Sequence, residues 1–190
     1  MKIWNEIWDY VKMIIIVVVV VLVINNVVLI NAKIPSESME NTIMTGDRIF
    51  GYRLAYGLNM DVFGHEISKK WKDPERFDIV IFKYPDDESQ LFIKRIIGLP
   101  GDKVEIKDGK VYINDKELKS DVYGITDYID YPGIAEEPIT LGDDEYCCLG
   151  DNRPVSQDSR YKEVGPVKRS IIVGKVWIRI WPLTKFGKVS

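Results

Sequence analysis

The chain has 190 residues, enough for a short anchor and one compact domain. Hydrophobic residues make up 46% of the sequence, which supports a real core and excludes a disordered chain. The net charge of −3 excludes the strongly basic surface typical of nucleic-acid binding.

The Cys and His residues argue against a disulfide framework and against a metal site. Cys147 and Cys148 are neighbours, and a disulfide between neighbours closes only with strain. We therefore expect two buried thiols. The single histidine, His65, adds too few ligands for zinc and has no acidic or Cys partner at a motif spacing. We expect no metal or other cofactor, and a surface or packing role for His65.

An apolar run near the N-terminus predicts a membrane helix. Residues 13–24 are all Met, Ile, Val or Leu, and after Asn25 and Asn26 the run resumes to residue 30. As a helix, residues 13–30 would span roughly 27 Å, close to the hydrocarbon thickness of a bilayer. We therefore expect an anchor over residues 11–31, with residues 1–10 before it and a single domain over residues 32–190.

A cleavable signal peptide is the alternative interpretation of this run. Lys2 and Lys12 would be its charged part and Ala32 its cleavage site, but the run is longer than a usual apolar signal region. Lys33 and Arg48 on the other side balance the first two lysines, so charge alone leaves the orientation open.

From residue 44 onward the pattern is typical of an antiparallel β protein. Residues 78–83 and 91–97 predict one hairpin, and residues 104–106 and 111–113 predict a second around Asp108-Gly109. Residues 171–181 predict a long closing strand with a bulge at Gly174. The signals in residues 53–75 are mixed and indicate a loop with a short helix. Residues 119–145 are polar and predict the loose edge of a small inserted lobe, which we place at about 104–145.

Two serines follow the apolar run. Ser36 and Ser38 are separated by one residue and lie behind Pro35. This spacing suits a nucleophile and a helper, provided that the rest of the chain supplies a base.

Lys94 is the candidate base. Phe92, Lys94 and Ile96 share one face of a predicted strand. An amine on an apolar face has a lowered pKa, and a neutral lysine can take a proton from a serine hydroxyl. The alternative, a lysine at a sheet edge with its head in water, is commoner and is favoured by this strand alone.

The loop from Gly150 to Arg160 is dense in short hydrogen-bonding side chains, which favours an ordered loop over a solvated turn. Ser156 can orient a lysine amine by a hydrogen bond. Asp158 and Arg160 are close enough in sequence to pair and fix the loop.

Taken together, these motifs resemble bacterial type I signal peptidases. They come in the family's order and cover most of residues 34–181. Each is weak alone and the combination is specific: Pro35-Ser36-Glu37-Ser38-Met39 with Thr42, Gly46-Asp47, Asp78-Ile79-Val80, Lys94-Arg95, Gly98-Leu99-Pro100-Gly101-Asp102, Gly150-Asp151-Asn152-Arg153 and Ser159-Arg160.

The resemblance implies a membrane-bound serine endopeptidase with a Ser–Lys dyad. Ser38 matches the nucleophile and Lys94 the general base, while the Ser36 hydroxyl joins the Ser38 backbone N–H in the oxyanion hole. Ser156 matches the serine that positions the lysine. The supporting residues are Asp158 and Arg160. A Ser-His-Asp triad is disfavoured because His65 lies outside every matched motif.

The resemblance also implies topology and substrate. It is to the single-anchor branch, with a cytoplasmic N-terminus, a signal-peptidase-like antiparallel β domain outside the cell membrane, and the site at the outer leaflet. The partners are then the lipid bilayer and the signal peptides of exported preproteins, cut after small residues at −1 and −3. Met39 and Ile96 are candidates to line shallow substrate pockets. Trp177 and Trp181 are candidate lipid contacts, although strand aromatics usually pack in a core.

The sequence departs from the family pattern at two places. Asn41 stands where proline is frequent, which should alter only how the chain leaves the nucleophile turn. Pro154-Val155 replaces Asp-Asn and removes polar groups next to Ser156.

Two alternative functions stay open at this point. One is a specialised processing peptidase with a narrow substrate, and the other is a tethered β domain that binds partners without catalysis.

Overall fold

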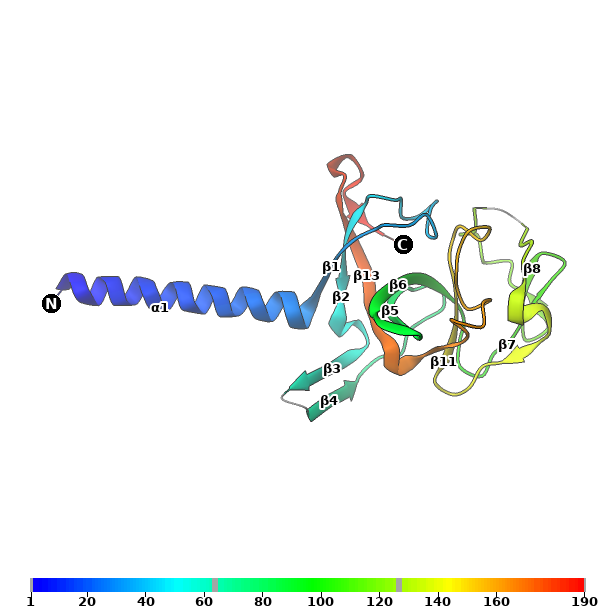
Figure 1. Ribbon diagram of the computed structural model, residues 1–190, viewed down its shortest axis with the longest axis horizontal. Coiled ribbons are helices and arrows are strands. Elements are labelled where there is room, and N and C mark those ends of the chain that lie inside the picture. Colours follow the sequence, from blue (N-terminus) through cyan, green and yellow to red (C-terminus); the bar gives the residue numbers. More distant parts are fainter. Residues whose placement is uncertain (1, 63–64, 126–127, 190) are drawn as a thin grey trace.

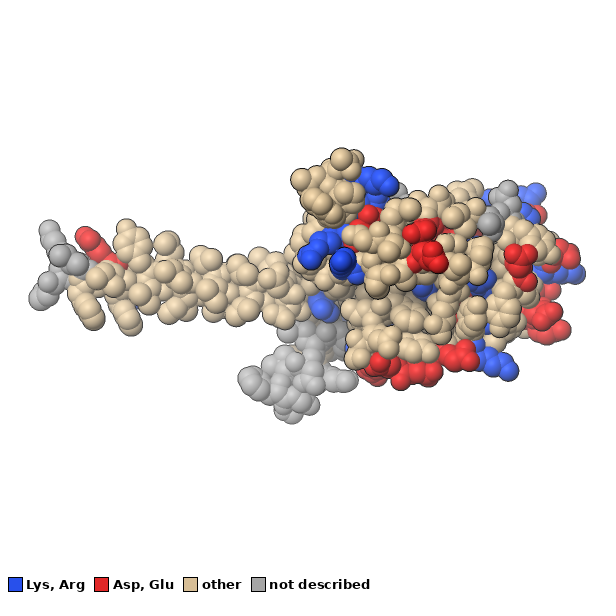
Figure 2. Space-filling model, turned by 45° about the horizontal axis from the view of Figure 1, so that its top comes forward, with Lys and Arg blue, Asp and Glu red and all other residues tan. Residues whose placement is uncertain are grey.

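The computed structural model describes residues 2–62, 65–125 and 128–189. One long helix, α1 (Lys2–Val23), projects as a rod from a β domain (Figure 1). A π-helical turn, Ile24–Val28, continues it. The stretch Glu6–Val28 is long and apolar enough to cross a membrane. Between its ends, the visible surface of the rod is free of charged side chains, and Lys and Arg gather where it joins the domain (Figure 2).

The helix ends earlier than predicted. Leu29–Lys33 form strand β1, which pairs antiparallel with β2 (Arg48–Tyr52), so residues 29–31 belong to the sheet instead of the anchor. The side-chain amide of Asn26 donates to the Leu22 carbonyl at 2.8 Å and satisfies one acceptor at the helix end. Ile30 is buried in the core of the domain. Tertiary packing, rather than the apolar run itself, decides where the helix stops.

The prediction of a mainly β, antiparallel domain is confirmed. The large sheet has the order β1-β2-β13-β5-β6-β11-β12, with β14 also pairing with β13. Its remaining strands are β5 (Ile79–Tyr84), β6 (Asp87–Gly98), β11 (Glu145–Leu149), β12 (Val167–Lys168), β13 (Ile172–Trp181) and β14 (Gly187–Lys188).

The first predicted hairpin and the closing strand are also confirmed. β5 and β6 pair in a register that puts Val80 opposite Lys94. The pairing of β13 with β5 shifts between Ile172 and Gly174, where the bulge was expected. A Cβ on Gly174 would lie 2.8 Å from the Tyr52 carbonyl oxygen, so only glycine fits there.

A smaller four-stranded sheet forms the inserted lobe, at the end of the domain away from α1 (Figure 1). Asp108 (φ 50°) and Gly109 (φ 72°) make the two-residue turn that the sequence predicted. The sheet has the order β10-β7-β8-β9, with strands β7 (Lys103–Lys107), β8 (Lys110–Ile113), β9 (Lys116–Glu117) and β10 (Ile139–Thr140).

The prediction of a loop with a short helix over residues 53–75 is wrong where two strands form in place of the loop. A short 3-10 turn, Arg53–Ala55, leads into a hairpin of β3 (Gly57–Val62) and β4 (His65–Lys70). Within the described residues, β3 and β4 pair only with each other. Their sequences accordingly lack the continuous apolar run that is typical of a strand buried on both faces.

The core is divided by the pleat of β5. Ile79 and Ile81 join one buried cluster, whereas Val80 and Phe82 join another on the opposite face. A third cluster fills the lobe. Cys147 and Cys148 are buried free thiols, as expected. Trp177 and Trp181 are 52% and 54% exposed, so neither is a core residue.

Candidate active site

Ser38 lies in the turn that follows β1, and the loop after β11 holds its backbone. The Asn152 N–H donates to the Ser38 carbonyl at 3.1 Å, and the Asn152 side-chain amide donates to the Glu37 carbonyl at 3.1 Å. The hydroxyls of Ser36 and Ser38 lie 3.5 Å apart. Ser36 is exposed and Ser38 is half-buried, so both can meet a substrate.

The structure brings Lys94 to Ser38. Lys94 Nζ lies 2.7 Å from Ser38 Oγ, although the residues are 56 positions apart. Lys94 is only 4% exposed, and its Nζ lies 5.3 Å from the centroid of the Phe92 ring. Burial lowers the pKa of Lys94 from 10.5 to about 8, and the Asp158 carboxylate is the strongest of the charges that oppose this shift. The sheet-edge alternative, with the amine in water, is wrong.

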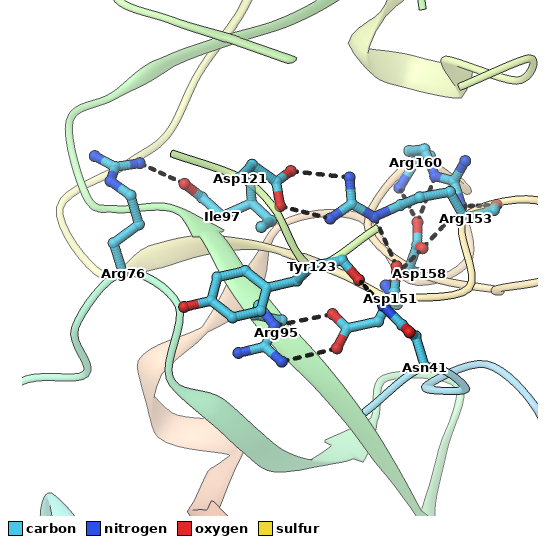
Figure 3. Close-up of polar contacts among 11 residues, drawn as sticks. Asn41, Arg76, Arg95, Ile97, Asp121, Tyr123, Asp151, Arg153, Asp158 and Arg160 are labelled. Carbon is cyan, nitrogen blue, oxygen red and sulfur yellow. Dashed lines mark hydrogen bonds and ion pairs between the residues drawn. The ribbon is translucent and has the colours of Figure 1, made fainter. Parts of the chain in front are cut away.

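Asp158 and Arg160 lie in the loop beside the dyad. Both are at most 2% exposed, and Arg160 Nε donates to Asp158 at 2.8 Å (Figure 3). Asp158 also accepts the Gly150 N–H at 3.0 Å. A Cβ on Gly150 would lie 2.4 Å from the Ser38 carbonyl oxygen, so the loop reaches the nucleophile turn only with glycine here.

Ser156 does not make the hydrogen bond that we expected with the Lys94 amine. Its Oγ is buried and has no hydrogen-bond partner among the described residues. It lies against Gly150 instead, where an added Cβ would come within 2.1 Å of it. Ser156 therefore packs against the backbone at Gly150, within the loop from Gly150 to Arg160, which we call the catalytic loop.

A buried ion pair behind the nucleophile turn was missing from our list of candidate residues. Arg95 donates to Asp151 through Nε at 2.9 Å and through Nη2 at 2.8 Å (Figure 3). The Thr42 hydroxyl donates to the same carboxylate at 2.5 Å. All three residues stand in the motifs quoted above, and the one available signal for their role was Arg95, a charged residue in an otherwise mostly apolar strand segment.

A groove of about 810 Å³ opens onto the dyad. Residues 32–39 form one wall and residues 90–94 form the other. Met39 lines it, as expected for a substrate contact. Ile96 does not: it is fully buried in the core cluster with Val80 and Phe82, because it lies deeper along β6 than the groove reaches.

The remaining sequence predictions concern His65 and metals. His65 begins β4 and its backbone pairs with Val62 in the two-stranded sheet, outside the sheet that carries Lys94. In the part of the chain that the structure describes, no group of three or more His, Cys, Asp or Glu side chains lies close enough to hold a metal ion.

Comparison with known proteins decides the family. The family model described as signal peptidase, peptidase S26, matches residues 7–181. This chain belongs to that family. It is 38% identical over 163 residues to a probable signal peptidase I-2 of Synechocystis, covering 83% of this chain and 65% of that protein. It is 32% identical over 192 residues to a signal peptidase I of Pseudomonas aeruginosa, covering 83% and 67%.

The chain spans 65% and 67% of the length of these two relatives, about two thirds of each. A solved signal peptidase I from Enterococcus faecalis is 36% identical, with a TM-score of 0.45 over 55% of this chain and 97% of that one. The resemblance drawn from the motifs is confirmed by the family match.

Proposed function

We propose that this chain is a membrane-anchored serine endopeptidase that removes N-terminal signal peptides from exported preproteins. The observation that carries the proposal is the contact between Ser38 Oγ and the buried amine of Lys94 at 2.7 Å. Family membership supports the same activity.

In the first step, neutral Lys94 takes the proton of Ser38 while Oγ attacks the scissile carbonyl carbon. The negative charge on the carbonyl oxygen is stabilised by the Ser38 N–H and the Ser36 hydroxyl. Lys94 then gives its proton to the leaving amine, and an acyl ester remains on Ser38. In the second step Lys94 removes a proton from water, the hydroxide attacks the ester, and the proton returns to Ser38.

The groove supports an extended substrate. Its walls are the backbone stretch before Ser38 and the exposed part of β6, which run on either side of the dyad. An extended peptide between two such walls presents alternate side chains to the protein. We propose that small residues at −1 and −3 fit the shallow surface that includes Met39.

The site must also meet a bilayer. Ser38 follows the apolar stretch Glu6–Val28 by ten residues, five of them in β1. We propose that the N-terminus, with residues 1–10, faces the cytoplasm and that the β domain lies outside the cell membrane. The exposed indoles of Trp177 and Trp181 are proposed to rest on lipid.

The test is cleavage of a preprotein with an Ala-x-Ala site by the purified full chain in detergent. Ser38→Ala and Lys94→Ala should each abolish cleavage while circular dichroism shows an intact fold. Lys83→Ala, a partly exposed lysine on β5, is the matched control and should cleave normally. Retained activity in Lys94→Ala would refute the dyad.

Orientation has a separate test. Lys107 is exposed at the end of β7, so a Lys107→Cys variant places a thiol on the β domain while Cys147 and Cys148 stay buried. A membrane-impermeant maleimide should label this variant in intact spheroplasts. Labelling only after lysis would place the domain in the cytoplasm.

A further inference from the structure

The segment of the lobe that we predicted to be loose is tied to the catalytic loop. We define the lobe strap as residues 121–125. Asp121 forms a two-bond ion pair with Arg153 at 2.9 and 3.0 Å, with side-chain exposures of 6% and 3% (Figure 3). The Ile125 N–H donates to the Asp151 carbonyl at 2.8 Å. Both contacts fix the strap to the loop that follows β11.

Tyr123, in the middle of the strap, covers Arg95. Its ring centroid lies 3.6 Å from the guanidinium carbon of Arg95, and Figure 3 shows the ring lying against that side chain. The Phe77 ring packs against Tyr123 with centroids 5.3 Å apart. The Phe77 carbonyl accepts a hydrogen bond from Arg95 at 3.0 Å, so the strap and the guanidinium form one packed unit.

This unit connects to the nucleophile turn. Arg95 binds Asp151 by two hydrogen bonds, and its Nη2 also donates to the Thr42 hydroxyl at 3.2 Å. Thr42 lies four residues beyond Ser38 in the same turn. Arg95 is also the neighbour of Lys94 on β6 and points to the opposite face of the strand. The ion pair between Arg95 and Asp151 therefore connects the strand that carries Lys94 to the turn that carries Ser38. It does so on the face of β6 opposite Lys94.

The strength of that ion pair depends on the exclusion of water. Arg95 and Asp151 are 1% and 0% exposed. An aromatic face over a desolvated guanidinium adds cation–π attraction and keeps solvent from the charges. Removing the ring would admit water and loosen Thr42. Catalysis is sensitive to such a change, because a displacement of about 1 Å between reacting groups can lower the rate about a hundredfold.

A second link runs directly from the turn to the strap. The Asn41 side-chain amide donates to the Tyr123 carbonyl at 3.2 Å. Asn41 has φ 89°, a conformation that asparagine tolerates and proline cannot adopt. The departure from proline at this position thus comes with a contact that a proline side chain could not make.

We propose that Tyr123 is a positioning residue for Ser38, acting through Arg95, Asp151 and Thr42, and that Asn41 joins the same turn to the strap. The small lobe then contributes to catalysis through residues 121–125 without touching the substrate. This inference rests on the proposed peptidase function.

The test compares Tyr123→Phe with Tyr123→Leu in the full chain, in detergent, on an Ala-x-Ala preprotein. Tyr123→Phe keeps the ring and should retain wild-type kcat. Tyr123→Leu should lower kcat by about tenfold and leave KM within about twofold, because the loss is in geometry at the reacting atoms. Asn41→Gly keeps the positive φ, removes the amide, and should lower kcat by about threefold.

Hydrogen exchange gives a readout that needs no activity. Peptides covering residues 38–44 should exchange about tenfold faster in Tyr123→Leu than in Tyr123→Phe, while peptides from β13 exchange equally. Equal exchange at residues 38–44, or equal kcat in the two variants, would overturn the inference. Failure of the wild-type chain to cleave would instead refute the proposed function. If Tyr123→Leu unfolds, Asn41→Gly decides: unchanged kcat and unchanged exchange at residues 38–44 would overturn the inference.

Discussion

Replacing Lys94 with methionine should abolish cleavage and yet stabilise the protein at neutral pH. Lys94 is 4% exposed, so its charged form has lost almost all hydration. Each tenfold change in proton affinity corresponds to about 1.4 kcal/mol. Lowering the pKa of Lys94 from 10.5 to about 8 therefore costs about 3 kcal/mol of folding free energy while both states are protonated.

The sign of this effect depends on pH. Below pH 8 the folded and unfolded chains both hold the proton, and the whole cost is present. Between pH 8 and 10.5 the folded chain has released the proton and the unfolded chain has not, so stability rises with pH. Above that range the cost is gone. Methionine avoids the cost but loses the hydrogen bond to Ser38, which is worth about 1 kcal/mol.

The assay is urea unfolding of the full chain in detergent, followed by circular dichroism at pH 7 and pH 10. Lys94→Met should be about 2 kcal/mol more stable than wild type at pH 7 and should lose that advantage at pH 10. Lys83→Met, at a partly exposed lysine, is the control and should show little dependence on pH. A Lys94→Met variant less stable than wild type at pH 7 would refute the idea of a desolvated amine.

Three further substitutions test the surroundings of the dyad. Gly150→Ala places a methyl group on the Ser38 carbonyl oxygen and should lower kcat more than about tenfold; normal turnover would show that the loop adjusts freely. Asp158→Asn leaves Arg160 buried without its counter-charge and should cost about 3 kcal/mol in urea unfolding, whereas an unchanged midpoint would contradict the ion pair's structural role. Asn41→Pro cannot adopt φ 89° and should cost about 3 kcal/mol in the same experiment, while Asn41→Gly should cost far less.

Local signals in the sequence predicted much of the β domain. Asp108-Gly109 tolerates the positive φ of a two-residue turn, so these two residues were enough to predict the second hairpin. The apolar runs within residues 78–83 and 91–97, with turn residues between them, likewise identified β5 and β6. The β3–β4 hairpin was missed although Leu58, Met60 and Val62 alternate with other residues, because the turn signals at Gly57, Gly64 and Asp73-Pro74 favoured a loop.

The site was predictable only in part, because its contacts join distant segments. The order of the motifs identified Ser38 and Lys94 as candidate catalytic residues, and the structure places their polar atoms in contact. Periodicity cannot tell how deep a groove extends along a strand, so Ile96 was taken for a groove residue and is a core residue. Nor can it show that Tyr123, in a polar stretch, lies on the guanidinium of Arg95.

The pH dependence of kcat/KM for an Ala-x-Ala preprotein tests the central claim most directly. This ratio reports the ionisations of the free enzyme. If neutral Lys94 is the base for Ser38, kcat/KM rises with pH through a single step centred near pH 8, where burial places the pKa of the Lys94 amine. A rate that stays level from pH 6 to pH 10 would contradict an amine base.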